Sequence, residues 1–478
     1  MKAILAIVFS TLIIYLNAQP LTSKVNLSDK SKKIDSLMSA VNKSGQFMGA
    51  VLVAENGNII YKKGFGFSDM KTKEKFSPAT QCYIGSLSKQ FTAMGIVILE
   101  EKGKINYDQP IRQYFPELPE CYQPVTIRNM LQHTSGLALF DDFPDMTEHD
   151  VFNILLKQTS LRFTPGSKFE YCNANYTLLG MLIEMISGKS LDGFLTTNVF
   201  IPCGMKNTYV DEPPVKNRKR AVGYYLFGDE YNYNTYIGGA ASVVTTVEDL
   251  YKWDQTLYHP SIISKHSLVE IFSPGKNEWE SDMYGKQGYG FGWFISGDEN
   301  NEIVQHDGGF AGFRSYIERQ VKNHNSIIFI SNVRHELIGN IRKGIVNILN
   351  DKPYTIPKIS SANWIMSKAK QVGMKQAILD YKSLSNTKDT GNYYFSEREC
   401  NSLAYYLLRN NRTDDAILMF KLNTEQFPAS GNVFDSIGEA YLKAGDKEKA
   451  LASYKKAFEL DLNNSNAADM IKKLQEKQ

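Results

Sequence analysis

Cysteine is scarce in this 478-residue chain, which has only Cys82, Cys121, Cys172, Cys203 and Cys400. No two of them form a CxxC pair, so their spacing excludes zinc-ribbon and thioredoxin-type sites. In an oxidising compartment one pair would be able to bridge, but the sequence leaves open which pair. We expect most of the five to be buried as small apolar side chains.

Metal-binding patterns and strongly charged regions are also missing. No HExxH motif and no paired His-carboxylate spacing occurs, so the sequence predicts no metal and no cofactor. The formal net charge is only +3, and the basic residues are interspersed with acidic ones. This balance argues against nucleic acid or an anionic membrane surface as a partner.

Long apolar runs are absent beyond the N-terminus. The leader MKAILAIVFSTLIIYLNAQP has one basic residue, an apolar run and a small residue before Gln19. This layout is typical of a secretory signal peptide over residues 1–18, cleaved after Ala18. A spanning helix needs about 20 apolar residues, so a retained anchor is the less favoured alternative. The sequence therefore predicts an exported, secreted or periplasmic protein with no membrane segment after cleavage.

Residues 28–350 mix strand and helix patterns. FMGAVLVAENGNIIYKKGFG predicts a hairpin around Asn56–Gly57. EIVQHDGGFAGFRSYIERQVKNHNSIIFISN predicts three more strands, with turns at Gly308–Gly309 and Asn323–Asn325, and ELIGNIRKGIVNILN predicts a helix after them. Together they predict an α+β domain in which helices flank an antiparallel five-stranded sheet, with a helical subdomain between the two groups of strands.

The last part of the chain has a different composition. Residues 351–365 contain prolines and small polar residues and are predicted to be a linker to a small all-α domain over 366–478. Within it, small residues and aromatics recur at the spacing of tetratricopeptide-like repeats, which we predict at 397–430 and 431–464. An unrelated pair of helical hairpins is the alternative. Such repeats make a protein partner an open expectation for this region.

The stretch YIGSLSKQFTAMG places Ser86 three residues before Lys89. If a helix begins at Ser86, the two side chains share one face and are able to touch. A serine hydroxyl needs a base within hydrogen-bond reach to act as a nucleophile, and a desolvated lysine is such a base. Alone, however, Ser-x-x-Lys is better explained by an N-terminal helical turn with a capping serine and a solvated lysine.

Two further segments carry candidate site residues. In FEYCNANY, Tyr171 would be able to move protons and Asn173 to orient a lysine or a substrate amide. In VQHDGGFAGF, His306 is expected to end a strand, and the backbone at Gly308 and Gly309 to approach a bound acyl group and donate an oxyanion N–H. A loop with a capping Asn and a glycine-rich hairpin turn are the ordinary explanations.

In this order, Ser-x-x-Lys, Tyr-x-Asn and His-x-Gly resemble the serine β-lactamase and penicillin-binding-protein superfamily, especially class C β-lactamases and their esterase and peptidase relatives. The phrases TIRNMLQHTSGL and GGAASVVTTVEDLYKW also look like segments of that family. The resemblance covers roughly residues 30–350. It implies the following roles: Ser86 as the acylated nucleophile, Lys89 as its base, Tyr171 in proton transfer, Asn173 and His306 at the substrate, and Gly308 and Gly309 along the oxyanion strand. His133 looks structural in that family.

The resemblance implies an exported bacterial serine hydrolase that forms an acyl-enzyme on Ser86 with an amide, peptide or ester, as β-lactamases, D-Ala-D-Ala carboxypeptidases and esterases do. His306 stands where a lysine is common, which weakens recognition of a substrate carboxylate because the charge becomes pH-dependent. Cys172, inside Tyr-x-Asn, is interpreted as a packing choice. An alternative class is an interaction protein, in which the repeats recruit a partner and the hydrolase domain is regulatory.

Overall fold

The computed structural model describes residues 28–140, 145–212, 219–228, 230–231, 235–275, 277–281, 284–297, 302–335, 337–385 and 393–476. The predicted signal peptide, residues 1–18, lies outside the described residues.

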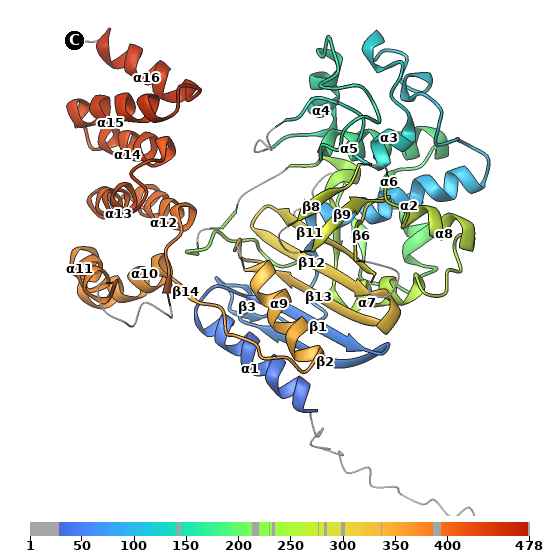
Figure 1. Cartoon of the computed structure of the whole chain (residues 1–478), viewed down its shortest axis with the longest axis horizontal. Coiled ribbons are helices and arrows are strands. Elements are labelled where there is room, and N and C mark those ends of the chain that lie inside the picture. The colour runs from blue at the N-terminus through green and yellow to red at the C-terminus, as the bar shows by residue number, and fades with distance from the viewer. Residues whose placement is uncertain are drawn as a thin grey trace, which may run out of the picture.

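One large antiparallel sheet organises the first part of the chain (Figure 1). Its strands, in spatial order, are β2 Asn58–Phe65, β1 Gly49–Glu55, β13 Asn325–Ser331, β12 Phe313–Gln320, β11 Ile303–Phe310, β10 Phe294–Ser296, β9 Gly285–Tyr289 and β8 Trp279–Ser281. The predicted α+β class is confirmed. The five predicted strands lie side by side as β2-β1-β13-β12-β11, and three short strands that we did not predict widen the sheet from five strands to eight.

Turn residues explain where the hairpins reverse. Asn56 and Gly57 both have positive φ, at 50° and 72°, as a two-residue turn matching strand twist requires. The turn between β11 and β12 lies at Ala311–Gly312, again with positive φ at both residues. The prediction of a turn at Gly308–Gly309 is therefore wrong, because both glycines lie within β11, and His306 is in the middle of that strand and does not end it.

Helices cover both faces of the sheet (Figure 1). On one face, α1 Asp29–Lys43 and α9 Ile338–Leu349 pack against the sheet through an apolar cluster that includes Leu37, Ile341 and Phe329. The other face carries the larger core and the helical subdomain. Its helices are α2 Ser88–Glu101, α3 Ile127–Leu131, α4 Glu148–Leu156, α5 Asn173–Ser187, α6 Leu191–Leu195, α7 Val247–Thr256 and α8 Lys265–Ile271.

A buried ion pair ties the helical subdomain to the sheet. The Arg319 guanidinium of β12 donates from Nε to Asp254 of α7 over 2.6 Å, and both side chains are almost fully buried. Ser326 of β13 donates to the other oxygen of the same carboxylate. Both partners of such a pair are needed, because either alone would leave a charge in the core.

Short strands support the loops near the helical subdomain. They are β3 Phe67–Asp69, which pairs with β4 Glu74–Lys75, and β5 Cys82–Tyr83 and β6 Tyr209–Val210, which flank β7 Val243–Thr245. All five cysteines are unpaired thiols, and Cys121 alone is partly exposed. No helix in the described ranges is both long and apolar enough to cross a bilayer.

The C-terminal helical region, residues 359–476, forms a separate column of helices (Figure 1). It begins with β14 Ile359–Ser360, which pairs with β15 Tyr393–Tyr394. The helices are α10 Ser361–Val372, α11 Met374–Ser385, α12 Glu397–Arg409, α13 Thr413–Gln426, α14 Gly431–Lys443, α15 Lys447–Leu460 and α16 Ser465–Gln475. Each predicted repeat spans one helix pair, α12–α13 or α14–α15, and the assignment to the tetratricopeptide type stays a prediction.

Candidate active site

Ser86 lies in a 3-10 turn that joins the sheet to the long buried helix α2. This turn, η1 Gly85–Leu87, follows β5, and α2 begins at Ser88, two residues later than we expected. Gly85 has a φ of +53°, which favours glycine, so it sets the direction in which the chain enters the turn. The turn still brings the predicted pair together, because Lys89 Nζ lies 3.1 Å from Ser86 Oγ.

The ammonium end of Lys89 is fully enclosed. Its side chain has no exposed surface, and besides Ser86 it donates to Asn173 Oδ1 and to the Ala240 carbonyl, each over 2.9 Å. Asn173 is the first residue of α5, and Ala240 ends the short turn η5 Gly238–Ala240. Three elements far apart in the sequence therefore fix Lys89 against the serine.

Tyr171 covers this pair. Lys89 Nζ is 4.9 Å from the centroid of its ring, within the range of a cation–π contact. Burial raises the pKa of Tyr171 well above its usual value, and the neighbouring Ser86 hydroxyl offsets this only in part. The phenol therefore keeps its proton across the neutral pH range.

His306 carries no charge at neutral pH. Its ring is buried, with Nδ1 2.5 Å from the Asp307 carbonyl and Nε2 3.1 Å from the Tyr289 hydroxyl. Burial, aided by the positive charge of Lys89, lowers the pKa of His306 to about 3. The hydrogen bond to the Asp307 carbonyl raises the pKa by less than burial lowers it. The charge expected at this position is therefore pH-dependent only well below neutral pH.

Strand β11, which carries Gly308 and Gly309, packs directly on the serine turn. A Cβ atom on Gly85 would lie 2.8 Å from the backbone of Gly309, and one on Gly308 would lie 2.0 Å from the Ile84 carbonyl oxygen. Ser315 Oγ of the neighbouring strand donates to that same carbonyl over 2.6 Å. Only glycines allow this approach, which places the predicted glycines beside Ser86.

Three side chains around the site were not predicted as functional. His133 lies under Tyr171, with ring centroids 4.3 Å apart, and accepts the Cys172 backbone N–H at Nδ1, in agreement with a structural role. Tyr289 holds His306 and also packs against His133. The guanidinium of Arg314 occupies the space that a Gly309 side chain would need, since its Nη1 is 1.7 Å from that Cβ position.

The first two of these residues had a weak signal in the sequence. Tyr289 lies in the glycine-rich segment QGYGFGW, and His133 in the phrase that resembles the family. Arg314 had none, because its position depends on the strand pairing of Gly309 with Arg314.

Comparison with known proteins places this geometry in a family. The model of the Beta-lactamase family matches residues 34–342. The chain belongs to the Beta-lactamase family. Among curated relatives of this family member, "Penicillin-binding protein 4*" of Bacillus subtilis (strain 168) is 34% identical over 360 residues, which cover 69% of this chain and 78% of the relative. "Protein flp" of Staphylococcus aureus (strain MW2) is 28% identical, covering 69% and 68%.

Solved structures show the same fold. A penicillin-binding protein homologue from Pyrococcus abyssi superposes with a TM-score of 0.60 at 23% identity, over 68% of this chain and 78% of the other. The D-amino acid amidase from Ochrobactrum anthropi SV3 gives 0.58 at 22% identity, over 68% and 98%. This chain is thus a serine hydrolase of the β-lactamase and penicillin-binding-protein type.

Proposed function

We propose that the protein is an exported serine hydrolase that cleaves an amide or peptide through an acyl-enzyme on Ser86. The observation that carries this proposal is the 3.1 Å contact between Lys89 Nζ and Ser86 Oγ, inside a site that also fixes Lys89 by Asn173 and Ala240. A serine with a base at this distance is the arrangement that nucleophilic catalysis requires.

The first step is acylation. In its neutral form Lys89 keeps its two N–H donors on Asn173 and Ala240 and turns its lone pair to Ser86. It then takes the proton of Ser86 as the hydroxyl oxygen attacks the substrate carbonyl carbon. The backbone N–H groups of Ser86 and Gly309 then stabilise the negative charge that develops on the carbonyl oxygen. When the tetrahedral intermediate collapses, the bond to the leaving amine breaks and the acyl group stays on Ser86.

Tyr171 acts as the proton donor to the leaving group. Its raised pKa favours the protonated phenol, so it is suited to give a proton and unsuited to be the resting base. The tyrosinate recovers its proton from the Lys89 ammonium nearby. Water then attacks the acyl-enzyme with the same groups in reverse order.

A neutral His306 limits the range of substrates that the site is expected to bind well. Without a cation at the middle of β11, a carboxylate close to the scissile bond gains no ion pair at this position, which lowers the affinity for such substrates without preventing acylation of Ser86. Amides and peptides whose recognition depends on the backbone of β11 suit it better. The D-amino acid amidase that shares the fold is named for an amide substrate, which supports this class.

The interaction-protein alternative is less favoured. It would expect the C-terminal helices to stand apart from the hydrolase, yet Gln46 of the first part donates to the Tyr394 hydroxyl over 3.2 Å, and Phe227 packs on Tyr406 with ring centroids 6.2 Å apart. The column of helices thus contacts the hydrolase part at these two places, which supports a role close to catalysis.

The test is turnover of three probes by the mature chain and by its Ser86→Ala variant: benzylpenicillin, D-alanine amide and a short-chain p-nitrophenyl ester. We expect the amide to be hydrolysed by the mature chain and not by the variant. Turnover of the ester alone would make the enzyme an esterase. Equal turnover of any probe by the variant would remove Ser86 as the nucleophile.

A further inference from the structure

The C-terminal helical region packs against a loop of the hydrolase part. Residues 219–228 reach α12, where the Arg409 guanidinium lies 4.8 Å from the centroid of the Tyr225 ring. Phe227 of the same loop joins the apolar core of the helices. The loop and α12 therefore form one continuous wall.

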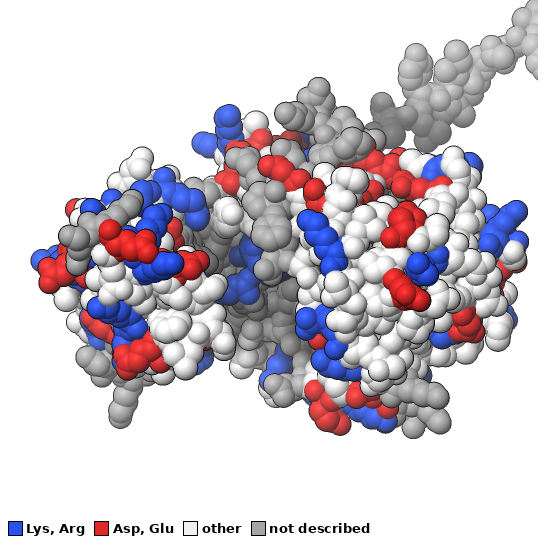
Figure 2. Space-filling model, turned by 90° about the horizontal axis from the view of Figure 1, so that it is seen from above, with Lys and Arg blue, Asp and Glu red and all other residues white. Residues whose placement is uncertain are grey.

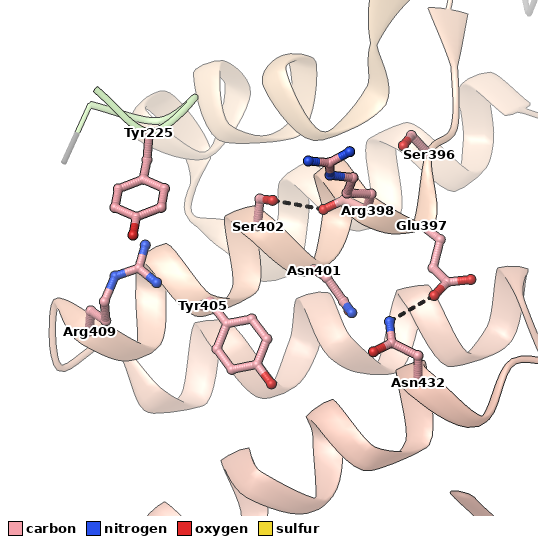
Figure 3. Close-up of a pocket in the computed structure, with 9 residues that line it drawn as sticks. All are labelled: Tyr225, Ser396, Glu397, Arg398, Asn401, Ser402, Tyr405, Arg409 and Asn432. Carbon is pink, nitrogen blue, oxygen red and sulfur yellow. Dashed lines mark hydrogen bonds between the residues drawn. The ribbon is translucent and has the colours of Figure 1, made fainter. Parts of the chain in front are cut away.

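Three neighbouring cavities run along this wall. The first, about 680 Å³, lies on α12 and α14 and is drawn in Figure 3 with Tyr225 and Arg409 at one end and Asn432 at the other. The second, about 270 Å³, shares Tyr225, Arg398 and Ser402 with it. The third, about 380 Å³, shares His335 with the second and ends at β11. Each cavity shares lining residues with the next, so the three are neighbours along one stretch of surface, which we call the groove. Figure 2 shows the hollow between the two parts with basic side chains in it.

The groove offers hydrogen-bond donors to a ligand. Arginines line all three cavities: Arg398 and Arg409 the first, Arg334 and Arg398 the second, and Arg314 the third. The arginines have protein partners too, since Arg334 donates to the Tyr231 hydroxyl and Arg314 to the His335 carbonyl, but each guanidinium carries five N–H donors. The acidic side chains are fewer, and two of them accept hydrogen bonds, Glu397 from Asn432 and Glu399 from Tyr394. The third, Asp307, lies at the end of the groove on β11.

Two buried donors point to a missing partner. His335 is 1% exposed, and its Nδ1 accepts the Leu337 N–H, so the neutral ring carries its proton on Nε2, which has no partner among the described residues. The Gln287 amide nitrogen is likewise buried without a partner in that part of the chain. Both line the cavity that ends at β11. Buried donors of this kind are normally satisfied, so they indicate a ligand that accepts hydrogen bonds.

The groove ends at the oxyanion strand. Asp307 of β11 and Arg314 of β12 line its last cavity, and the Arg314 guanidinium covers the outer face of Gly309. The loop that carries Tyr225 packs on the β11–β12 turn, where a Cβ on Gly223 would lie 2.1 Å from the Ala311 carbonyl oxygen. A chain lying in the groove would therefore arrive beside the acyl site.

We propose that this groove, from Asn432 on α14 to Arg314 beside β11, holds the distal part of an extended peptide substrate that carries carboxylates. The arginines and the two unpaired donors are able to donate hydrogen bonds to the carboxylate and carbonyl oxygens of such a peptide. The aromatic rings of the groove are able to pack against its side chains. This inference rests on the proposed function, because it assigns the substrate of the same site to the peptide class.

The test measures binding without turnover. A fluorescein-labelled, N-acetylated Ala-Glu decapeptide is titrated into the full mature chain carrying Ser86→Ala, with an Ala-Gln decapeptide of equal length beside it. We expect saturable binding of the acidic peptide and at least tenfold weaker binding of the neutral one, since hydrogen bonds to charged groups differ from neutral ones by about this much. Adding the Arg398→Glu substitution should weaken binding of the acidic peptide at least tenfold.

A matched control makes the same charge change outside the groove. Lys421 is exposed on α13 and lines none of the three cavities, so Lys421→Glu should leave binding within about twofold. Equal loss with both variants, equal affinity for both peptides, or no saturable binding would overturn the proposal.

Competition links the groove to catalysis. In the active chain the acidic peptide should raise the KM of the short ester and leave kcat unchanged, and Arg398→Glu should remove that effect. If the peptide binds without changing ester KM, the groove does not lead to the acyl site and the inference fails. Covalent labelling of Ser86 by penicillin is a separate readout, so it shows whether the proposed function itself has failed.

Discussion

Because β11 packs closely on the serine turn, we predict opposite effects for alanine substitutions at two adjacent glycines, a large loss at Gly308 and a small one at Gly309. In Gly308→Ala the new Cβ would lie 2.0 Å from the Ile84 carbonyl oxygen, about 1.4 Å short of the 3.4 Å at which ordinary contact begins. That oxygen belongs to the backbone just before Ser86, so strand and turn must separate. In Gly309→Ala the nearest atom is Nη1 of Arg314, the far end of a flexible side chain that is able to swing away.

The expected losses of stability and of rate depend on whether rigid backbone or a flexible side chain has to move. Overpacking of a rigid site costs about 1–3 kcal/mol, and each kcal/mol lowers Tm by about 2–4 °C in a domain of this size class. A misplacement of about 1 Å in a catalytic site costs on the order of 10²-fold in rate. Gly308→Ala should therefore lose about 100-fold in acylation rate and several degrees in Tm, whereas Gly309→Ala should stay within about threefold of the parent.

The assay is the rate of fluorescent-penicillin labelling, measured on both variants together with thermal unfolding. Far-UV circular dichroism before each run ensures that the folded form is compared. If Gly308→Ala labels as fast as the parent, or Gly309→Ala is the slower of the two, the account of how β11 is placed is incorrect.

Three further predictions concern the base, the buried histidines and the ion pair. Lys89→Ala should slow ester turnover by about 10²–10⁴-fold with little change in KM, as loss of a general base does; a change confined to KM would contradict its role. Burial lowers the pKa of both His306 and His335 to about 3, so their unfolded forms bind protons first as the pH falls. The free energy of unfolding should be intact above pH 6.5 and fall between pH 6.5 and 3, by about 2 kcal/mol per histidine at pH 5. Urea titrations should find a smaller loss in the His306→Gln, His335→Gln double variant. If the free energy of unfolding of that variant falls with pH as steeply as in the parent, the buried histidines are not its cause. Arg319→Ala, which leaves the Asp254 carboxylate buried alone, should lower the free energy of unfolding by about 3–5 kcal/mol, and a loss below 1 kcal/mol in the same titration would contradict that.

The fold class was predictable because local patterns agreed with it. The hairpin at Asn56–Gly57 and the helix after β13 follow from turn chemistry and periodicity. The short strands β8, β9 and β10 were not predicted, since strands of three to five residues carry too little alternation to stand out. Gly308–Gly309 was predicted to be a turn because glycine pairs are common in turns. In the structure these glycines are needed for a tertiary reason, since only a residue without a side chain allows β11 to pack this closely on the Ser86 turn.

The candidate site was predictable only in part. Ser86, Lys89, Tyr171 and Asn173 were found through motif order, and the structure brings all four together. The charge state of His306 was not predictable, since it depends on burial. The same holds for Arg314 and for the groove, which arise from strand pairing and from how the C-terminal helices meet a distant loop. Such contacts leave no pattern in one sequence.

The most direct test of the central claim is the mass of the intact protein after brief incubation with benzylpenicillin, followed by peptide mapping of the adduct. We predict a gain equal to one penicilloyl group, located on the peptide that contains Ser86, and absent from Ser86→Ala. An adduct on any other residue, or an adduct that persists in Ser86→Ala, would contradict a nucleophilic Ser86.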